Sequence, residues 1–389
     1  MKALVLEAEL VPRGGYALSP FEEETGKAMT GSSVWRNPEL SIKEIEKPKP
    51  GKRDLLIKVK NCGVCGSDIH FYERDEEGYI LYPGLTKFPC VIGHEFSGVV
   101  EEVGPEVKGF KEGDLVTSEE MIWCGECTPC RNGYPNHCER LEELGFTING
   151  AFAEWISVGS KYCWKLNEIQ QAYGSEINAL EAGALVEPTS VAYNGIFVRG
   201  EGFGPGDFVG VWGAGPIGLA AIALSRAAGA SKIFAFEIKK ERRALAIQMG
   251  ADFVFDPAAL QKKGTGPAEK VLELTQGQGI SMGIEAAGAP LFTIPEIEKS
   301  LAINGKIVQI GRAAQEVPMY LERFQVRRAQ FYGAQGHSGH GTFRSVIRLM
   351  ASKRIDMRPI VTSRFALDQA IDAIERASGR ADGKVLVNI

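Results

Sequence analysis

The sequence predicts an α/β protein whose second half forms a doubly wound parallel sheet. Three observations lead to this fold class. Short apolar runs alternate with helical patterns between residues 195 and 334, and a glycine-rich motif separates the first of these runs from its helix. Residues 1–60 instead alternate apolar and polar positions in short segments divided by Pro and Gly. Helical crossovers between apolar strands are typical of parallel sheets, whereas alternation is typical of antiparallel strands.

The glycine motif follows the apolar run 207–212 and precedes a helical pattern over 219–228; it reads Gly213-Ala-Gly215-Pro216-Ile217-Gly218. In this pattern the first glycine makes a tight turn, the second lets the backbone approach a pyrophosphate, and the third lets helix and strand pack closely. The N-terminus of the helix would add free N–H groups and a partial positive charge. A chain with 46 glycines produces such spacings by chance, so the prediction depends on the strand before the motif and the helix after it.

The next apolar run, 232–237, ends in Glu237. At this separation from the glycine motif, a carboxylate meets the ribose hydroxyls of a dinucleotide. It favours NAD over NADP, because a 2′-phosphate would meet a like charge. Arg242 is also expected at the cofactor, and the basic residues around it, Lys239, Lys240 and Arg243, keep NADP open. An ordinary βαβ unit with a surface Glu is the alternative interpretation.

Further β-like runs complete the predicted sheet at 251–256, 281–286, 305–311 and 330–333, with helical patterns at 240–249 and 268–276. After the sheet, the pattern predicts a helix near 342–352 and a strand near 359–361. Residues 12–38 are polar and rich in glycine, which predicts a surface loop.

Composition excludes several classes of protein. The chain of 389 residues is long enough for two domains, and 44% hydrophobic with 24% charged residues is the profile of a globular protein. A net charge of −5 offers no general attraction for nucleic acid or anionic membranes. The sequence shows no apolar run of membrane-spanning length and no signal peptide, so a cytoplasmic location is expected.

Four of the eight cysteines lie close together in the pattern C-x2-C-x2-C-x7-C, as Cys124, Cys127, Cys130 and Cys138. In a reducing compartment such a cluster indicates metal rather than disulfides. One flexible loop can place the four thiolates tetrahedrally around Zn²⁺ and close the site to substrate, which predicts a structural zinc. An iron–sulfur centre and a redox dithiol are the competing interpretations. The other cysteines, Cys62, Cys90 and Cys163, are expected to be buried small apolar residues.

A second set of metal-binding residue types is scattered along the chain. It comes from three fragments, C-G-V-C-G-S-D-I-H, G-H-E-F-S-G and L-V-E-P, and comprises Cys65, His94, Glu95 and Glu187. Sulfur, nitrogen and oxygen donors together suit a catalytic zinc, which keeps three protein ligands and an open position. Spacing alone does not join them, because residues so far apart are usually unrelated.

These fragments, followed by the glycine motif, resemble the zinc-dependent medium-chain dehydrogenases over nearly the whole chain. The resemblance implies a β-rich, GroES-like catalytic domain at 1–194 and 335–389, with an NAD-binding Rossmann domain at 195–334 inserted in it. It implies a catalytic zinc on Cys65 and His94, with Glu95 or Glu187 completing the set, and a structural zinc on the four clustered cysteines. An E-P fragment is typical of the polyol, sorbitol and threonine dehydrogenases of the family.

The resemblance also implies a mechanism: an alcohol bound at the zinc loses its proton, and a hydride passes to the nicotinamide. Ser67 and His70 are expected to relay that proton to solvent, with Glu95 close to the reacting group. The ordinary pKa of a histidine suits this task. Asp68 is expected to support a zinc ligand. Without the family, a histidine after a Ser-Asp turn is more often a surface residue.

The expected substrate is a polyol or cyclitol. The enlarged segment 73–84 lies between Cys65 and His94, and Gln335, His337, Ser338 and His340 follow the predicted sheet, where the family places polar substrate contacts. A glycine-rich hinge with exposed histidines is the alternative for the latter segment. Together with residues 12–35 these features resemble the cyclitol-oxidising branch of the family, so scyllo-inosose or a related inositol derivative is expected. Erythritol, threitol or another linear polyol is the second choice.

A function of another class would make the four cysteines a zinc ribbon and the glycine motif a nucleotide sensor without catalysis. The acidic balance and the absence of a basic stripe beside the cysteines disfavour nucleic-acid binding. A zinc-free reductase would lack both metal sets. The resemblance further implies a homodimer or homotetramer.

Overall fold

Two units make up the chain, whose residues 1–389 are all described by the computed structural model. The first unit contains Met1–Glu187, Ser363–Gly379 and Val385–Ile389; the second contains Pro188–Thr362 and Arg380–Lys384. Residues 335–362 cluster with the second unit, whereas the family resemblance assigns them to the first domain. The functional division at 194/195 and 334/335 stays a prediction.

Antiparallel strands dominate the first unit, where a three-stranded sheet has the order β2-β1-β4 and a seven-stranded sheet the order β10-β6-β5-β3-β18-β17, with β9 also paired to β3. A small ribbon pairs β7 with β8. The bounds are β1 Lys2–Leu10, β2 Trp35–Glu44, β3 Asp54–Gly63, β4 Cys90–Val91, β5 Glu95–Val103, β6 Leu115–Ser118, β7 Met121–Ile122, β8 Glu142–Glu143, β9 Trp155–Gly159, β10 Cys163–Lys165, β17 Val361–Ala366 and β18 Lys384–Asn388.

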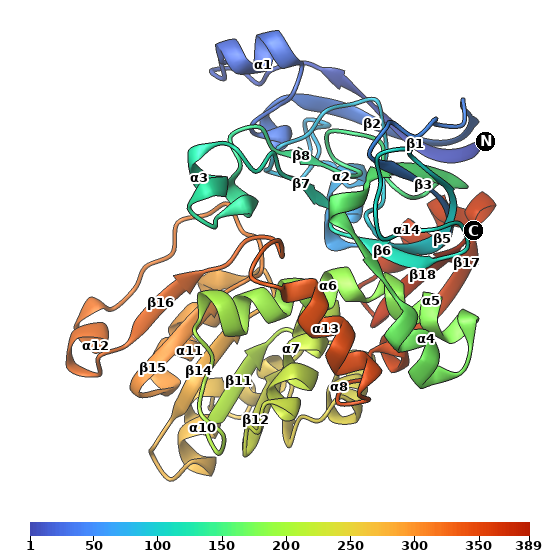
Figure 1. Cartoon of the computed structure of the whole chain (residues 1–389). Helices are drawn as coiled ribbons and strands as arrows, with labels where there is room; N and C mark the ends of the chain where they lie inside the picture. Colours follow the sequence, from blue (N-terminus) through green and yellow to red (C-terminus); the bar gives the residue numbers. More distant parts are fainter. The chain divides into compact units, whose positions relative to one another are not determined.

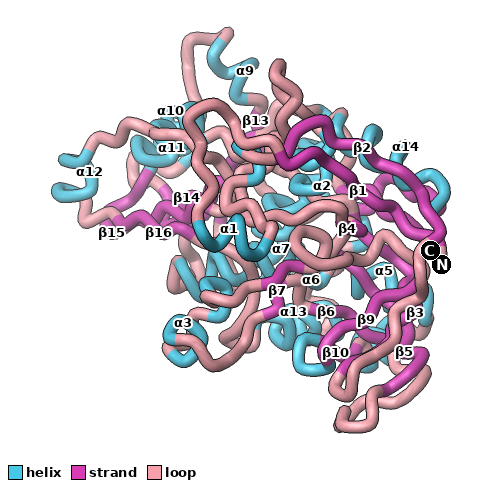
Figure 2. The backbone as a smooth tube through the Cα atoms, turned by 90° about the horizontal axis from the view of Figure 1, so that it is seen from above, coloured by secondary structure: helices cyan, strands magenta, loops and turns pink.

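The helices of this unit are short and lie between long loops, as Figure 2 shows around α3. Their bounds are α1 Pro20–Thr25, α2 Gly66–Tyr72, α3 Thr128–Arg131, α4 Asn167–Tyr173, α5 Glu176–Ala184 and α14 Ala370–Ser378; α6 runs over Val186–Tyr193, where the first unit gives way to the second. The core gathers alternating residues of β1, β3 and β5, including the fully buried Leu4, Ile57 and Phe96.

A six-stranded parallel sheet forms the second unit, in the order β13-β12-β11-β14-β15-β16. This is the doubly wound order of dinucleotide-binding domains. Figure 1 shows most of these strands side by side, with helices beside them. The bounds are β11 Phe208–Trp212, β12 Lys232–Phe236, β13 Phe253–Phe255, β14 Ile280–Glu285, β15 Leu301–Gln309, β16 Gln330–Gly333, α7 Pro216–Ala227, α8 Lys240–Gln248, α9 Pro257–Gln261, α10 Pro267–Leu274, α11 Pro290–Ser300, α12 Leu321–Val326 and α13 Thr342–Ala351.

The predicted fold class is confirmed, and two local predictions need correction. Residues 12–38 are not one surface loop, because they contain α1 and the start of β2. Ser19 and Glu22 form a capping box: the Ser19 Oγ accepts from the Glu22 N–H at 3.4 Å and the Glu22 Oε2 accepts from the Ser19 N–H at 2.8 Å. Pro38 fits β2 because that strand lies at a sheet edge.

The second correction concerns the strand expected at 359–361. Residues Arg358–Ile360 form a short 3-10 turn, and the strand begins only at Val361. Pro359 has a fixed φ and no N–H to donate to a sheet, so the turn precedes the strand. Elsewhere the predicted elements lie within a few residues of the observed ones. None of the helices combines the length and apolar character that a membrane span requires.

Candidate functional site

The strand β3 delivers Cys65 to the N-terminus of α2. The Val64 N–H donates to the Val385 carbonyl at 2.9 Å, which fixes the exit of β3. Cys65 is the N-cap of α2, and its N–H donates to the Asp68 Oδ2 at 2.8 Å. Asp68 is fully buried. The carboxylate therefore fixes the backbone that carries the thiol.

His94 and Glu95 lie at the start of β5, directly after Gly93. The φ of Gly93 is +89°, and a Cβ at this position would lie 2.5 Å from the Phe152 ring. A Cβ at Gly150 would lie 2.1 Å from the Gly93 carbonyl oxygen. Only glycine allows backbones to approach so closely, and this packing brings the loop after β8 against the histidine. The Phe146 ring centroid lies 4.8 Å from that of His94.

The structure brings Cys65, His94 and Glu95 together, with one possible ligand atom of each within 4.8 Å of the others. His94 and Glu95 are buried, and Cys65 is partly buried. Burial by itself would lower the pKa of His94, but the Cys65 thiolate, Asp68 and Glu187 raise that pKa well above its ordinary range. Negative groups thus gather around this imidazole, an environment that favours a cation.

Glu187 lies close enough to influence His94, although its carboxylate is not part of the three-residue group. Its own close neighbour in the first unit is Glu120, which the sequence analysis did not single out: a carboxylate oxygen of each lies within 4.8 Å of the other. Both side chains are buried. The available signal was the pair Glu119-Glu120, two acidic residues directly after the apolar strand β6.

Ser67 and His70 lie one turn apart on α2. The Ser67 Oγ is buried and has no hydrogen-bond partner. The His70 side chain is 40% exposed, and its Nδ1 lies 3.5 Å from the Glu73 Oε2. One polar group thus lies inside the fold and the other reaches the surface, and helical spacing puts both on the same face.

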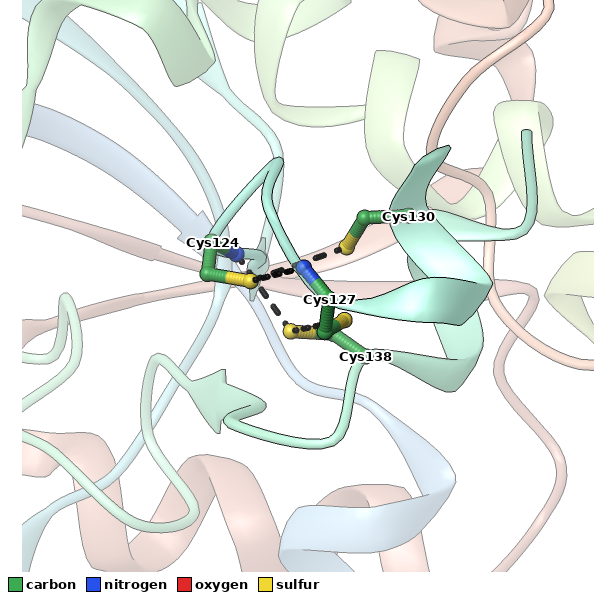
Figure 3. A group of neighbouring side chains, drawn as sticks. All are labelled: Cys124, Cys127, Cys130 and Cys138. Atoms are coloured by element: carbon green, nitrogen blue, oxygen red, sulfur yellow. Dashed lines mark hydrogen bonds between the residues drawn. The ribbon is translucent and has the colours of Figure 1, made fainter. Parts of the chain in front are cut away.

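The four clustered cysteines converge within one loop (Figure 3). The Sγ atoms of Cys124 and Cys130 are 4.0 Å apart, and those of Cys127 and Cys138 are 3.8 Å apart. Sulfur atoms bound tetrahedrally to one zinc lie about 3.8 Å from each other, as follows from Zn–S bonds near 2.3 Å. The sulfur spacing therefore fits zinc without rearrangement.

Backbone N–H groups point at these sulfur atoms. The Cys124 Sγ accepts from the N–H groups of Glu126 and Cys127 at 3.3 and 3.4 Å, and these bonds lower the pKa of Cys124 to about 6. Burial raises the pKa of Cys130 to about 12 and also raises that of Cys138. The Cys124 thiolate forms readily, whereas those of Cys130 and Cys138 need a cation to stabilise their charge. Cys62, Cys90 and Cys163 are buried, as predicted.

The glycine motif in the second unit joins β11 to α7. The φ of Gly213 is +91°, and a Cβ there would lie 2.7 Å from the Ala287 backbone; a Cβ at Gly218 would lie 1.8 Å from the Gly213 carbonyl oxygen. Gly215, the N-cap of α7, has only the Arg242 guanidinium nearby, at 3.5 Å from its hypothetical Cβ. Packing therefore requires glycine at 213 and 218. Gly215 instead leaves open space at the N-terminus of α7, where Pro216 and Ile217 begin the first turn.

Glu237 follows β12 and is buried beside the glycine motif. Its Oε2 accepts from the Ala214 N–H and its Oε1 from the Lys239 N–H, both at 2.8 Å. Arg242 on α8 donates from Nε to the Asp382 carbonyl at 2.8 Å, and burial lowers its pKa. The carboxylate and the guanidinium thus flank the loop where a dinucleotide would bind.

The four polar residues after β16 differ in exposure. His337 and Ser338 are buried, with the Ser338 Oγ 3.5 Å from the His337 Nδ1 and the Phe343 ring 5.1 Å from the imidazole. Gln335 and His340 are exposed, and the φ of His340 is +53°. Asn194 donates to the carbonyls of Gln335 and Gly336, which anchors the segment.

Comparison with known proteins places this geometry in a family. The alcohol dehydrogenase GroES-like domain matches residues 51–168, and the zinc-binding dehydrogenase domain matches residues 216–352. The chain belongs to the zinc-dependent medium-chain dehydrogenases. It is therefore an oxidoreductase with a GroES-like unit and a Rossmann unit.

Relatives of this dehydrogenase match it along almost its whole length. Scyllo-inosose 3-dehydrogenase of Thermotoga maritima is 48% identical over 387 residues, covering 97% of this chain and 96% of the relative. A solved structure from Thermotoga maritima, provisionally assigned as an alcohol dehydrogenase, superposes with a TM-score of 0.94 at 46% identity and covers 100% of both chains. A provisionally assigned zinc-binding dehydrogenase of Sinorhizobium meliloti 1021, solved bound to NADP, superposes with a TM-score of 0.78 at 27% identity, over 93% of this chain and 99% of that one.

The donor atoms of this family member fit zinc at both sites. The first set offers one sulfur, one nitrogen and one carboxylate, a mixture typical of catalytic zinc; the second offers four sulfurs, typical of structural zinc. The family thus supports a zinc- and nicotinamide-dependent enzyme, whereas the number of metal ions per chain and the choice between NAD and NADP belong to the proposal below.

Proposed function

We propose that this enzyme oxidises a secondary hydroxyl of a polyol or cyclitol to a ketone, with NAD⁺ as hydride acceptor. The observation that carries the proposal is the convergence of Cys65, His94 and Glu95 in one buried cluster. Scyllo-inosose or a related inositol derivative is the proposed substrate, because the relative at 48% identity is a scyllo-inosose 3-dehydrogenase and matches 97% of this chain. A linear polyol such as erythritol or threitol is the second choice.

The proposed catalytic zinc would be held by Cys65 and His94, with Glu95 or Glu187 as the further ligand. When bound, the zinc supplies a Lewis acid that lowers the pKa of a hydroxyl held beside it. Asp68 fixes the Cys65 backbone through a hydrogen bond, and its Oδ1 lies 3.9 Å from the His94 Nδ1, so its negative charge also acts on the second ligand.

Ser67 and His70 are the residues proposed to carry the hydroxyl proton of the substrate to solvent. Oxidation of an alcohol releases a hydroxyl proton as well as a hydride, and the proton has to leave a buried place. The buried Ser67 Oγ would take it from the substrate oxygen, and the half-exposed His70 would pass it to water. The His70–Glu73 pair supports this direction, because a carboxylate stabilises the protonated imidazole.

The proposed cofactor contacts follow from the second unit. The N-terminus of α7, with Gly213, Gly215 and Gly218, would bind the pyrophosphate. The Glu237 carboxylate would accept hydrogen bonds from the ribose hydroxyls, and its negative charge supports NAD over NADP because it would repel a 2′-phosphate. Arg242 would lie against the phosphates.

Other parts of the proposal rest on composition and on the family. A second, structural zinc on Cys124, Cys127, Cys130 and Cys138 gives two zinc ions per chain. Gln335, His337, Ser338 and His340 are proposed substrate contacts, for which the buried His337 and Ser338 are better suited than their exposed neighbours. We further propose the domain division 1–194 with 335–389 against 195–334, a homodimer or homotetramer, and a cytoplasmic location.

One assay tests the function. NADH formation is followed with NAD⁺ or NADP⁺ and a panel of scyllo-inosose, myo-inositol, erythritol, threitol, sorbitol, threonine and ethanol, before and after chelation, and bound zinc is counted. Chelator-sensitive reduction of NAD⁺ by a cyclitol supports the full proposal. Activity with linear polyols alone moves the substrate to the second choice, and inactivity on every hydroxyl compound in the presence of zinc contradicts it.

A further inference from the structure

Glu120 lies at the junction of β6 and β7, where the chain passes the catalytic cluster. Its backbone is fixed, since the Leu144 N–H donates to the Glu120 carbonyl at 3.0 Å. Its side chain is only 6% exposed. Burying a carboxylate costs several kcal/mol as an order of magnitude, so a glutamate is an unusual side chain at a buried position.

The position of the Glu120 carboxylate relates it to the catalytic cluster. One of its oxygens lies within 4.8 Å of a Glu187 oxygen, and Glu187 in turn contributes to the electrostatic environment of His94. The loop after β8, whose Leu144 fixes the Glu120 backbone, also carries the Phe146 that packs against His94. Glu120 therefore lies in the same region of the first unit as the proposed zinc ligands.

The burial of the neighbouring Glu119 is accounted for by hydrogen bonds from two tryptophan side chains. The Glu119 Oε1 accepts from the Trp164 indole and its Oε2 from the Trp123 indole, each at 3.1 Å. Both residues are buried and adjacent in sequence. Glu119 joins two parts of the first unit, whereas Glu120 extends toward Glu187. The two form a natural pair of target and control.

We propose that Glu120 determines specificity for polyhydroxylated substrates, by accepting a hydrogen bond from a second hydroxyl next to the one that is oxidised. This inference rests on the proposed function. The chemistry is general: an ionised carboxylate only accepts hydrogen bonds, and a polyol presents several donors close together. A bond of this kind is strong where water is excluded.

Discrimination follows from the same chemistry. A substrate with one hydroxyl offers the catalytic group its reacting oxygen but brings no donor to Glu120. A site built to receive a hydrogen bond rejects an analogue that lacks the donor far more strongly than an apolar pocket rejects a size mismatch. Glu120 would thus favour polyols and cyclitols over simple alcohols.

The test compares two replacements of graded chemistry in the full-length, zinc-loaded enzyme. Glu120→Gln keeps the shape and one neutral acceptor, and we expect the KM for the best polyol substrate to rise about tenfold. Glu120→Leu removes every acceptor at similar volume, and we expect a rise of about 100-fold. In both variants kcat changes much less than KM, and zinc content and melting temperature stay close to those of the unmodified enzyme.

The matched control is Glu119→Gln, which loses a charged acceptor of two indoles. It should lower the melting temperature and leave the polyol KM in place. This contrast separates recognition from stability, because a merely structural Glu120 would behave like Glu119.

Four results would overturn the inference. An unchanged KM in Glu120→Leu would show that this carboxylate does not meet substrate. A joint loss of zinc and kcat would make Glu120 a metal ligand, and loss of an additional bound metal ion would reveal a cation between Glu120 and Glu187. If the unmodified enzyme oxidises no polyol, the proposed function itself fails and this inference with it, a result distinct from an active enzyme whose KM ignores Glu120.

Discussion

The two metal-binding sets of the first unit differ in how the chain assembles them. The four cysteines come from a single loop between β7 and β8, and hydrogen bonds from neighbouring N–H groups already orient their sulfurs. Cys65 and His94 are brought together only by pairing of β3 with β5 across the sheet. A local set requires little beyond its own loop, whereas the assembled set requires the complete sheet.

The sets also differ in what surrounds them. In the proposed structural site, four thiolates would fill a tetrahedral shell and leave no position for another ligand. The cluster of Cys65, His94 and Glu95 has further polar groups near it: the buried Ser67 Oγ, and Glu187, whose carboxylate in turn lies close to that of Glu120. A metal ion with four protein ligands stabilises the fold, whereas one with an open position can bind substrate. Replacements among the four cysteines should therefore change the melting temperature, and replacements in the Cys65 cluster should change kcat.

The largest effect is expected from Cys65→Ala. Without the thiolate the catalytic metal is held weakly, and kcat should fall on the order of 10³-fold or more, because Lewis-acid stabilisation contributes several kcal/mol. NADH binding, measured by fluorescence, and the melting temperature should persist.

A suitable control is Cys62→Ala, a change of a fully buried cysteine on β3, three positions before Cys65. It should retain most of the activity. Full activity in Cys65→Ala would refute the zinc mechanism.

The next effect is expected from Cys127→Ser in the local set. Structural zinc contributes on the order of 10 kcal/mol to the folding of small metal-dependent peptides, so the melting temperature should fall by roughly 10 °C or more. Calorimetry and metal analysis measure the loss, with one zinc retained and kcat largely kept at low temperature.

Cys163→Ser, a buried cysteine outside the cluster, should keep both metals. If Cys127→Ser instead abolished kcat at full stability, the distinction between the two sets would be wrong.

A smaller effect is expected from Asp68→Asn. The amide no longer places a negative charge beside His94, a charge that supports this imidazole as a metal ligand, and the affinity for the catalytic zinc should fall about 10- to 100-fold. Competition with a chromogenic chelator measures this.

Asp75→Asn provides the comparison, because the Asp75 Oδ1 also accepts two backbone N–H groups, at 3.0 Å each, but Asp75 has no contact with the cluster among its hydrogen bonds. It should leave zinc affinity unchanged. Equal affinities in both variants would remove Asp68 from the site.

The smallest effect is expected from Glu126→Gln beside the four cysteines. Glu126 pairs with Arg140 at 2.9 Å, but the two side chains are 77% and 61% exposed. Exposed pairs contribute about 0–1 kcal/mol, so neither zinc content nor melting temperature should change measurably. A clear loss of zinc would mean that the local set depends on its surface charges as the assembled set depends on Asp68.

The regions formed within one segment of the chain were predictable from the sequence, whereas those assembled from distant segments were less so. The four-cysteine loop is readable from spacing alone, because its donors are neighbours in the chain. The parallel sheet is equally readable, since each strand and helix carries its own period, and the run 330–333 coincides with β16. The cluster of Cys65, His94 and Glu95 could be predicted only from a family resemblance, because the sequence of neither β3 nor β5 shows that these two strands pair.

Two features were not predicted from the sequence, each for a physical reason. The helix α1 is too short to show a period, although the Ser19 to Glu22 spacing of a capping box was present. Glu120 was missed because its neighbour Glu119 has the same side chain and the same burial, and only their partners separate them. Partners depend on tertiary structure, which no local pattern contains.

The pairing of β18 with β3 bears on the order in which this protein becomes active during synthesis. Leu386 and Val387 pair with Gly63 and Cys62, immediately before Cys65, yet nearly all the rest of the chain leaves the ribosome between these two strands. The four-cysteine loop and the strands of the parallel sheet are complete earlier in the chain, whereas β3, which precedes Cys65, pairs with a strand that is synthesised near the end. Contacts between such distant segments form late. Catalytic competence is therefore acquired last, so that a ribosome-bound nascent chain would be folded in large part and still inactive.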